Sequence, residues 1–345
     1  MNGGVRRLDL IGAGLFGTAI GWTLLAAGVG DPVPVAGTFA GAAAAVLVAR
    51  AVGTVSRSLV PGAVVVAGAI VAYLSRDDLL SAAPLSGPFG YANAKGAFFM
   101  LVTIAGLMVA VAASSLMTRA LGLTLAVGAA AVPFVSHVTT SSILVATLPL
   151  PAVLGAEMGP RAARVVVVTC GVLFILAVAT SGLLAVAYAR ADDSRVPSSV
   201  EEALSSDRLQ LWSEAVTIIA DHPATGVGPG RFRLFSPTAL ASPANLLFWA
   251  HNEFLQQGAE LGVAGLVLLI LLFVWGFARL WLNETPDAVT ALGAVALLMV
   301  GVQASVDYPL HFAPIALVSA ALVATGMVPA DARRVGPCAP EVGAG

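Results

Sequence analysis

The chain has 345 residues, of which 58% are hydrophobic and only 10% are charged. A water-soluble protein carries about 25% charged residues, so most of this surface needs lipid as its solvent. The net charge of −2 argues against nucleic acid as a partner, and the wide separation of Cys170 and Cys338 argues against a disulfide framework or a cysteine metal site.

Ten apolar runs are long enough to cross a bilayer, because a spanning helix needs roughly 20 mostly apolar residues. The sixth run is interrupted by Pro149 and Pro151. The first run is too long for a signal-peptide core and ends without an A-x-A cleavage site, so we expect it to remain as a span. The predicted spans are residues 8–30, 33–49, 58–75, 96–113, 119–136, 139–156, 165–189, 261–282, 288–306 and 308–328.

The predicted fold class is therefore an all-α polytopic membrane protein with about ten transmembrane helices and one long polar loop. With a cytoplasmic N-terminus and alternating spans, ten arginines fall on the inner side and the short outer loops hold only Arg76 and Lys95. The other arginines lie in the long loop, and long translocated loops are exempt from the positive-inside rule. We therefore expect both termini inside and the long loop outside.

This orientation divides the chain into spans at residues 1–190, an extracytoplasmic loop at 191–250, further spans at 251–330 and a cytoplasmic tail at 331–345. It also gathers titratable side chains on the outer face. That pattern is typical of a site open to the periplasm or cell exterior, although loops are polar in any case. The residues on that face include His137, His222, His251, His311, Asn93, Lys95 and Asp307.

The long loop predicts two helices. Residues 199–202 read Ser-Val-Glu-Glu, a capping box that starts a short helix, and residues 205–207 offer a second N-cap. An amphipathic helix is expected from Arg208 to Ala220, with Arg208 and Trp212 one turn apart on the same face. The His-Pro pair at 222–223 ends it.

A glycine-rich stretch follows at residues 226–233. Such loops can bring backbone N–H groups close to phosphate, and Arg231 and Arg233 could add bidentate contacts. A Gly/Pro run is more often only a turn, so both interpretations stay open.

The last feature begins at His251, where the loop enters the eighth span. His251, Leu255, Gly258 and Gly262 share one helical stripe, so we expect an accessible backbone beside a histidine at the membrane surface. An isolated interfacial histidine is more often a hydrogen-bonded structural residue than a catalyst.

Together these segments resemble the O-antigen ligase/O-antigen polymerase family. The ligase signature is His followed by Asn, Ser or Gln, nine residues, Gly, two residues, then Gly, Thr or Tyr, and this chain matches it with His251, Asn252, Gly262 and Gly265. Further similar segments extend the resemblance over roughly residues 85–325. They are Arg208, Trp212, Asp221–Pro223, Gly87–Asn93 and Ser305–Leu310 with Pro314.

Two features depart from the family pattern. Family members usually carry a Ser-Arg-Gly-like motif about fifty residues after the Asn segment, but residues 139–143 here read Thr-Thr-Ser-Ser-Ile, without arginine. Family members also usually have about twelve spans.

The resemblance implies transfer of a glycan from a polyprenyl-pyrophosphate carrier to a glycan or lipid acceptor, at the outer face of the cytoplasmic (inner) membrane, without metal or cofactor. His251 is then the catalytic base. Substrate binding is expected at Arg208 first, then at Arg231, Arg233, Asn252 and Asn93, with Lys95 a substitute for the missing arginine.

Two other functions remain open on sequence grounds. A non-enzymatic flippase or transporter of lipid-linked glycan should carry charged residues inside several spans, and almost none are found apart from edge residues such as Glu260. A degenerate family member with a binding or scaffolding role is suggested by Ser141-Ser142 in place of the arginine motif. Ligase and polymerase are not distinguished.

Overall fold

The computed structural model describes residues 3–77, 79, 89–190, 205–242 and 247–330, and every regular element within these ranges is a helix. The protein is an all-α polytopic membrane protein. Seven segments are long and apolar enough to span a membrane. They are α1 (Gly3–Leu25), α2 (Val33–Val55), α4 (Ala92–Ala112), α5 (Leu116–Val135), α6 (Thr139–Thr147) with α7 (Pro149–Glu157), α8 (Pro160–Arg190) and α13 (Glu253–Trp281).

Three shorter apolar helices coincide with the remaining predicted spans: α3 (Leu59–Leu74), α14 (Ala288–Ala304) and α15 (Ala313–Gly326). The prolines explain two local differences from prediction. The sixth run is two helices that meet at Leu148, because Pro149 starts the second one. The last run forms a short 3-10 helix, η2 (Pro309–His311), and α15 begins beyond it, with Pro314 in its first turn.

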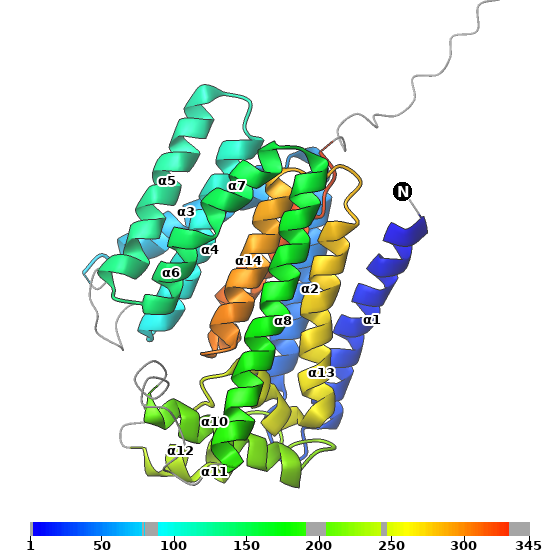
Figure 1. Cartoon of the computed structure of the whole chain (residues 1–345), viewed down its shortest axis with the longest axis vertical. Helices are drawn as coiled ribbons and strands as arrows, with labels where there is room; N and C mark the ends of the chain where they lie inside the picture. The colour runs from blue at the N-terminus through cyan, green and yellow to red at the C-terminus, as the bar shows by residue number, and fades with distance from the viewer. Residues whose placement is uncertain (1–2, 78, 80–88, 191–204, 243–246, 331–345) are drawn as a thin grey trace, which may run out of the picture.

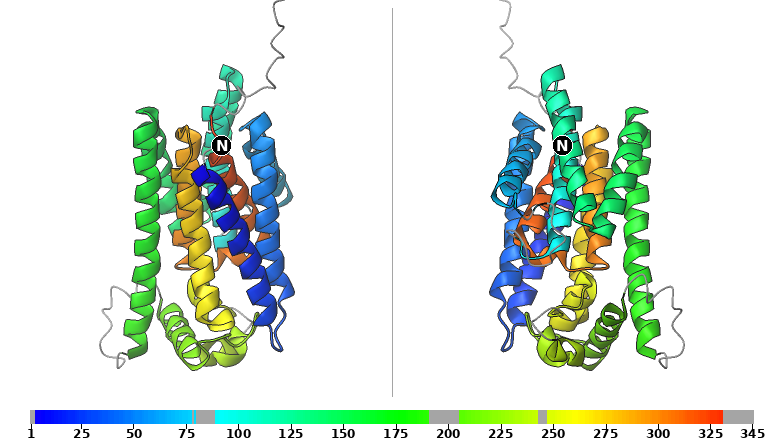
Figure 2. Two further views of the ribbon diagram at one scale, coloured as in Figure 1. Left: turned by 90° about the vertical axis from the view of Figure 1, so that its right-hand side faces the viewer. Right: turned by 90° about the vertical axis from the view of Figure 1, so that its left-hand side faces the viewer.

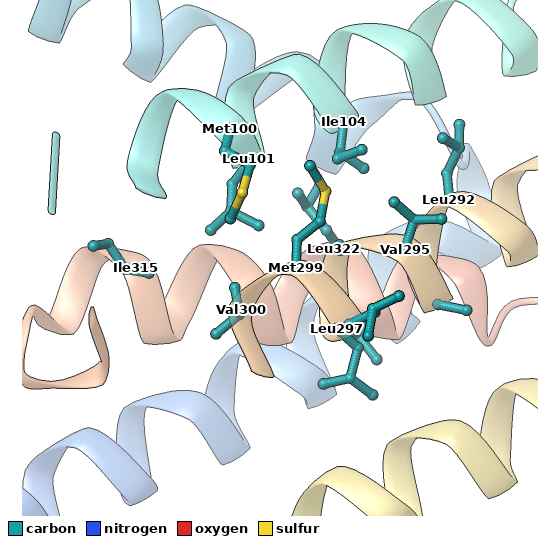
Figure 3. Packing of buried hydrophobic residues seen from close by; sticks show 14 of the residues in the cluster. Met100, Leu101, Ile104, Leu292, Val295, Leu297, Met299, Val300, Ile315 and Leu322 are labelled. Atoms are coloured by element: carbon teal, nitrogen blue, oxygen red, sulfur yellow. The ribbon is translucent and has the colours of Figure 1, made fainter. Parts of the chain in front are cut away.

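The core lies where α4, α14 and α15 meet. Figure 3 shows Met100 and Ile104 of α4 close to Val295 and Met299 of α14, with Leu322 of α15 beside them. Almost every residue of α14 is buried. Since lipid tails are as apolar as these side chains, such contacts stabilise the bundle mainly through close packing.

The bundle has two chemically different ends. The short helices α10 (Ser206–Asp221), α11 (Phe232–Phe235) and α12 (Pro237–Ala241) lie together at one end, opposite the N-terminal end of α1 (Figure 1). The side views in Figure 2 show the same separation. Arg50 and Arg279 bind Asp9 near the N-terminal end, at 2.7 and 2.9 Å.

The amphipathic helix predicted in the long loop is confirmed as α10. Its apolar stripe, including Leu211 and Ala215, is buried, and His222 follows its last residue. Ser205 occupies the N-cap position with φ of +63°, but its side chain forms no cap hydrogen bond. The helix predicted at residues 199–202 lies outside the described residues.

Candidate active site

The eighth span begins at Glu253, because Asn252 caps it. The Asn252 side-chain oxygen accepts from the backbone N–H groups of Phe254 and Leu255, each at 3.1 Å, and its amide donates to the carbonyl of Ser305 at 2.8 Å. The side chain is fully buried. His251 therefore precedes the helix, with φ of +50°, and its predicted place on a helical stripe is wrong.

The signature glycine Gly262 breaks α13. Its φ of +70° and ψ of −174° are not helical, and a Cβ atom there would lie 2.5 Å from the carbonyl oxygen of Ala224. Only glycine combines this backbone with so close an approach. The glycine thus serves the packing of the preceding loop against α13, and does not extend a stripe from His251 as predicted.

The carbonyl groups beside the break accept hydrogen bonds from outside the helix. A membrane requires this, because lipid offers no hydrogen bonds to the backbone. The N–H groups of Val227 and Gly228 donate to Ala259 and Glu260, at 3.0 and 2.9 Å. Trp22 of α1 donates its indole N–H to the carbonyl of Leu261 at 2.8 Å. The break is therefore built into the fold.

The glycine-rich stretch is a docking turn for α13. Besides the two N–H groups bound to backbone carbonyls, those of Gly230 and Phe232 donate to the Glu260 carboxylate at 2.9 and 3.1 Å. These four donors are consequently unavailable to a phosphate. Arg231 turns back onto the same loop, donating to the carbonyl of Val227 at 3.0 Å and lying over the ring of Phe235. The geometry favours the turn interpretation.

His251 is buried and not at the surface, where it was expected. Its imidazole Nδ1 is 3.4 Å from Oδ1 of Asp307, longer than a usual N–H···O hydrogen bond. Both ring nitrogens are buried, and neither meets hydrogen-bond geometry with the described residues. Trp212 of α10 holds the backbone by donating its indole N–H to the His251 carbonyl at 3.1 Å.

Asp307 joins three parts of the chain. Its carboxylate accepts from Asn93 at 2.6 Å, from the Tyr91 hydroxyl at 3.0 Å and from the Tyr308 backbone at 2.9 Å. Burial by itself raises the pKa of Asp307, but the contact with His251 and its charge, with smaller effects of Arg208 and Asn93, lower it below the ordinary value. The sequence placed Asp307 on the outer face, within the family-like segment Ser305–Leu310, but carried no signal that it would meet His251.

Burial, then the negative charge of Asp307, raise the pKa of the Tyr91 hydroxyl. The pKa of Tyr308 is raised for the same two reasons. Both phenols therefore stay protonated at neutral pH, and Tyr91 remains a donor to the carboxylate. The two rings stack at 5.0 Å between centroids, and Tyr308 also meets the His251 ring edge-on at 4.9 Å.

Arg208 and Arg233, the other two predicted arginines, do not turn back onto the glycine-rich loop as Arg231 does. Arg208, half-buried at the start of α10, is close enough for its charge to lower the pKa of Asp307. The Arg233 guanidinium lies 4.1 Å from the centroid of the Phe248 ring, and its buried Nε has no hydrogen-bond partner among the described residues. Phe248 contacts Trp249, whose ring lies 6.1 Å from that of Tyr308.

Lys95 lies in the first turn of α4, two residues after Asn93, and is fully buried. The neighbouring Gly96 packs against Ser141, because a Cβ atom at Gly96 would lie 3.0 Å from the Ser141 hydroxyl. Ser141 donates to Gln303 at 3.1 Å. The segment that lacks the family arginine thus lies against the turn that carries Lys95.

A second polar pair, absent from the predicted site, lies close by. His311 Nδ1 is 3.1 Å from the Glu253 carboxylate. Burial lowers the pKa of His311, but the charge of Glu253 and its contact with the ring outweigh burial and raise the pKa above the ordinary value. Within the described ranges, no group of three or more His, Cys, Asp or Glu side chains is arranged to hold a metal ion.

The sequence is similar to known proteins over part of its length. Residues 124–270 match the family model described as O-antigen ligase. The resemblance to the O-antigen ligase family is confirmed. The exopolysaccharide production protein ExoQ of Rhizobium meliloti (strain 1021) is 28% identical over 185 residues, which cover 49% of this chain and 42% of that protein. The chain thus spans less than half the length of this relative.

These similarities support a multi-pass membrane protein of polysaccharide biosynthesis, of the O-antigen ligase type. The matched residues contain Arg208, His251 and the glycine at the break of α13. Asn93, Lys95 and Asp307 lie outside the match, and the fold brings Asn93 and Asp307 into contact beside His251.

Proposed function

We propose that the chain transfers a glycan from a polyprenyl-pyrophosphate carrier to an acceptor hydroxyl at the outer face of the cytoplasmic membrane. One observation carries this proposal. His251 has an ionised carboxylate, Asp307, beside Nδ1, while Nε2 has no hydrogen-bond partner among the described residues. A buried ring nitrogen that no protein group engages, opposite a carboxylate, suits a base that takes a proton from substrate.

In the proposed reaction, neutral His251 carries its proton on Nδ1, toward Asp307, and accepts the acceptor hydroxyl proton on Nε2. The hydroxyl oxygen forms the new bond to the anomeric carbon of the donor glycan. The bond from that carbon to the pyrophosphate oxygen breaks, and its electron pair leaves with the pyrophosphate. Asp307 stabilises the imidazolium that forms.

The leaving pyrophosphate gains negative charge, which positive side chains must offset. Arg208 suits this role best because its charge already acts on Asp307. Arg233, held over Phe248, is the next choice, and Lys95 is proposed in place of the arginine absent from residues 139–143. Arg231 is the weakest choice, since its guanidinium is engaged with its own loop.

The two asparagines are better explained as positioning residues than as direct substrate ligands. Asn93 donates to Asp307 at 2.6 Å and so orients the carboxylate. Asn252 uses its oxygen to cap α13 and its amide to bind the Ser305 carbonyl. Each therefore acts on the substrate through the geometry of the His251–Asp307 pair.

Transfer is favoured over lipid-linked glycan movement or scaffolding, because neither of those needs a histidine base paired with a carboxylate. The decisive experiment reconstitutes the wild type and His251→Ala in liposomes with a lipid-linked glycan donor and a chelator. Glycan transfer and donor flipping are measured separately. We expect transfer to fall by ~10²–10⁴-fold without a change in flipping. Full transfer by the variant contradicts the base assignment, and loss of wild-type transfer in the chelator contradicts a metal-independent reaction.

A further inference from the structure

An apolar cavity lies beside the candidate active site, and none of the residues given roles in the proposed reaction line it. It lies among α1, α2, α13 and α15, and its walls include Phe16, Thr38, Ala42, Val46, Leu272 and Ala320. The lining on α2 extends from Pro34 to Val46, which is ~18 Å of helix at 1.5 Å per residue. The shape and lining suit an extended hydrocarbon chain.

One end of this cavity is polar, and one side chain that lines it has a buried acceptor without a donor. Glu253, Gln257 and His311 line that end. Gln257 donates its amide N–H to the Glu253 carboxylate at 3.3 Å, and its side-chain oxygen is buried with no hydrogen-bond partner among the described residues. Exchanging the amide oxygen and nitrogen would turn the oxygen toward a carboxylate, so the free acceptor is fixed by the geometry.

The charge at the polar end selects the kind of head group. Glu253 and His311 form a pair at 3.1 Å and offset each other. A phosphate would meet the Glu253 carboxylate and the Gln257 carbonyl, which are both acceptors. A hydroxyl, in contrast, supplies the donor that the Gln257 oxygen lacks.

We propose that this cavity binds an uncharged long-chain lipid alcohol, whose hydroxyl donates to the side-chain oxygen of Gln257 once that buried oxygen turns into the cavity. The site is separate from the pyrophosphate site proposed at Arg208. The ring of Tyr308 links the two, with centroids 5.8 Å from His311 and 4.9 Å from His251. The inference rests on the cavity and its polar end, and it does not depend on the proposed transfer reaction.

Photolabelling of the purified full-length protein tests this site. The probes are hexadecanol and hexadecyl phosphate, each with a diazirine in the chain, in phosphatidylcholine nanodiscs. We expect the alcohol to label the cavity side of α2 several-fold more than the phosphate. Ala42→Phe fills the cavity and should abolish most of this labelling. Ala44→Phe is the matched control, because Ala44 lies on the same helix but is exposed outside the cavity.

The head group is tested with Gln257→Leu, and with Gln257→Met as a second variant that keeps the side-chain length. Labelling by the alcohol should fall about fivefold, the effect of one lost hydrogen bond, while labelling by the phosphate should not change. Size-exclusion profiles identify folded variants. Equal labelling by both probes overturns the proposal and indicates ordinary bilayer lipid. So does alcohol labelling that survives Ala42→Phe, or an equal loss of both probes at Gln257.

Discussion

The imidazole of His251 and the carboxylate of Asp307 lie 3.4 Å apart, both buried, although one residue precedes α13 and the other follows α14. The same carboxylate accepts from Asn93 and Tyr91 at the start of α4. Three parts of the chain therefore depend on one charge, which makes Asp307 the most informative residue to change.

Asp307→Asn should lower glycan transfer by ~10²-fold or more, because the imidazolium formed at His251 loses its counter-charge. The pair acts as a unit, so adding Asp307→Asn to His251→Ala should cost little beyond the single His251 variant. Asp221→Asn, at the exposed end of α10, is the control and should transfer normally. Initial rates in proteoliposomes measure the effect, and additive losses in the double variant contradict a shared role.

Arg208→Ala should abolish transfer, and Arg208→Lys should retain little, because lysine keeps the charge but lacks the planar fork that grips phosphate. Arg231→Lys is the matched comparison. Its guanidinium binds the Val227 carbonyl, so we expect most activity to remain. Rates are compared at equal amounts of folded protein. Similar rates for Arg208→Lys and Arg231→Lys would contradict the proposal that Arg208, and not Arg231, binds the leaving pyrophosphate.

The pair formed by His311 and Glu253 should make stability depend on pH. The pKa of His311 is raised in the folded state. The stabilisation that protonated His311 gives the folded protein is therefore fully present below the ordinary histidine pKa of about 6.5. It is lost as pH rises through the higher pKa of the folded state. Thermal unfolding in detergent should show wild-type stability falling over this window. His311→Gln should flatten the profile, whereas His222→Gln, exposed after α10, should leave it unchanged.

Gly262→Ala should destabilise the protein by at least ~1–3 kcal/mol. Alanine at this position must adopt a backbone with positive φ. Its methyl group would lie 2.5 Å from the Ala224 carbonyl oxygen. Gly17→Ala provides the control, since a Cβ atom there meets nothing within 4 Å in helix α1. Its thermal midpoint should stay equal to the wild type or rise slightly. A Gly262→Ala protein as stable as Gly17→Ala means that the break of α13 is not required.

The orientation in the membrane is tested by cysteine labelling in a background without Cys170 and Cys338. Thr225→Cys, exposed in the turn after α10, should react with an impermeant maleimide in intact cells. Thr54→Cys, exposed in the last turn of α2, should react only after permeabilisation, because this end of α2 lies opposite α10–α12 (Figure 1). The reverse pattern places α10–α12 in the cytoplasm and contradicts the orientation predicted from the arginines.

The sequence by itself determined the fold class and the positions of the apolar helices. Lipid offers no hydrogen bonds to the backbone, so a long apolar run has almost no alternative to a helix, and that constraint is local. The amphipathic helix α10 followed from the same kind of local periodicity. Motif spacing singled out His251, and a helix face placed Arg208 beside Trp212, which proved to hold the His251 backbone.

Only the tertiary structure decided which residues meet. Asp307 could be paired with His251 only once α13 and α14 were packed together, because side chains distant in sequence leave no periodic signal. The glycine loop left a phosphate site open beside the more common turn, until its N–H groups proved to be used by Glu260 and the α13 backbone. The contact between His311 and Glu253 depends in the same way on packing, and so does the polar end that they form beside the apolar cavity.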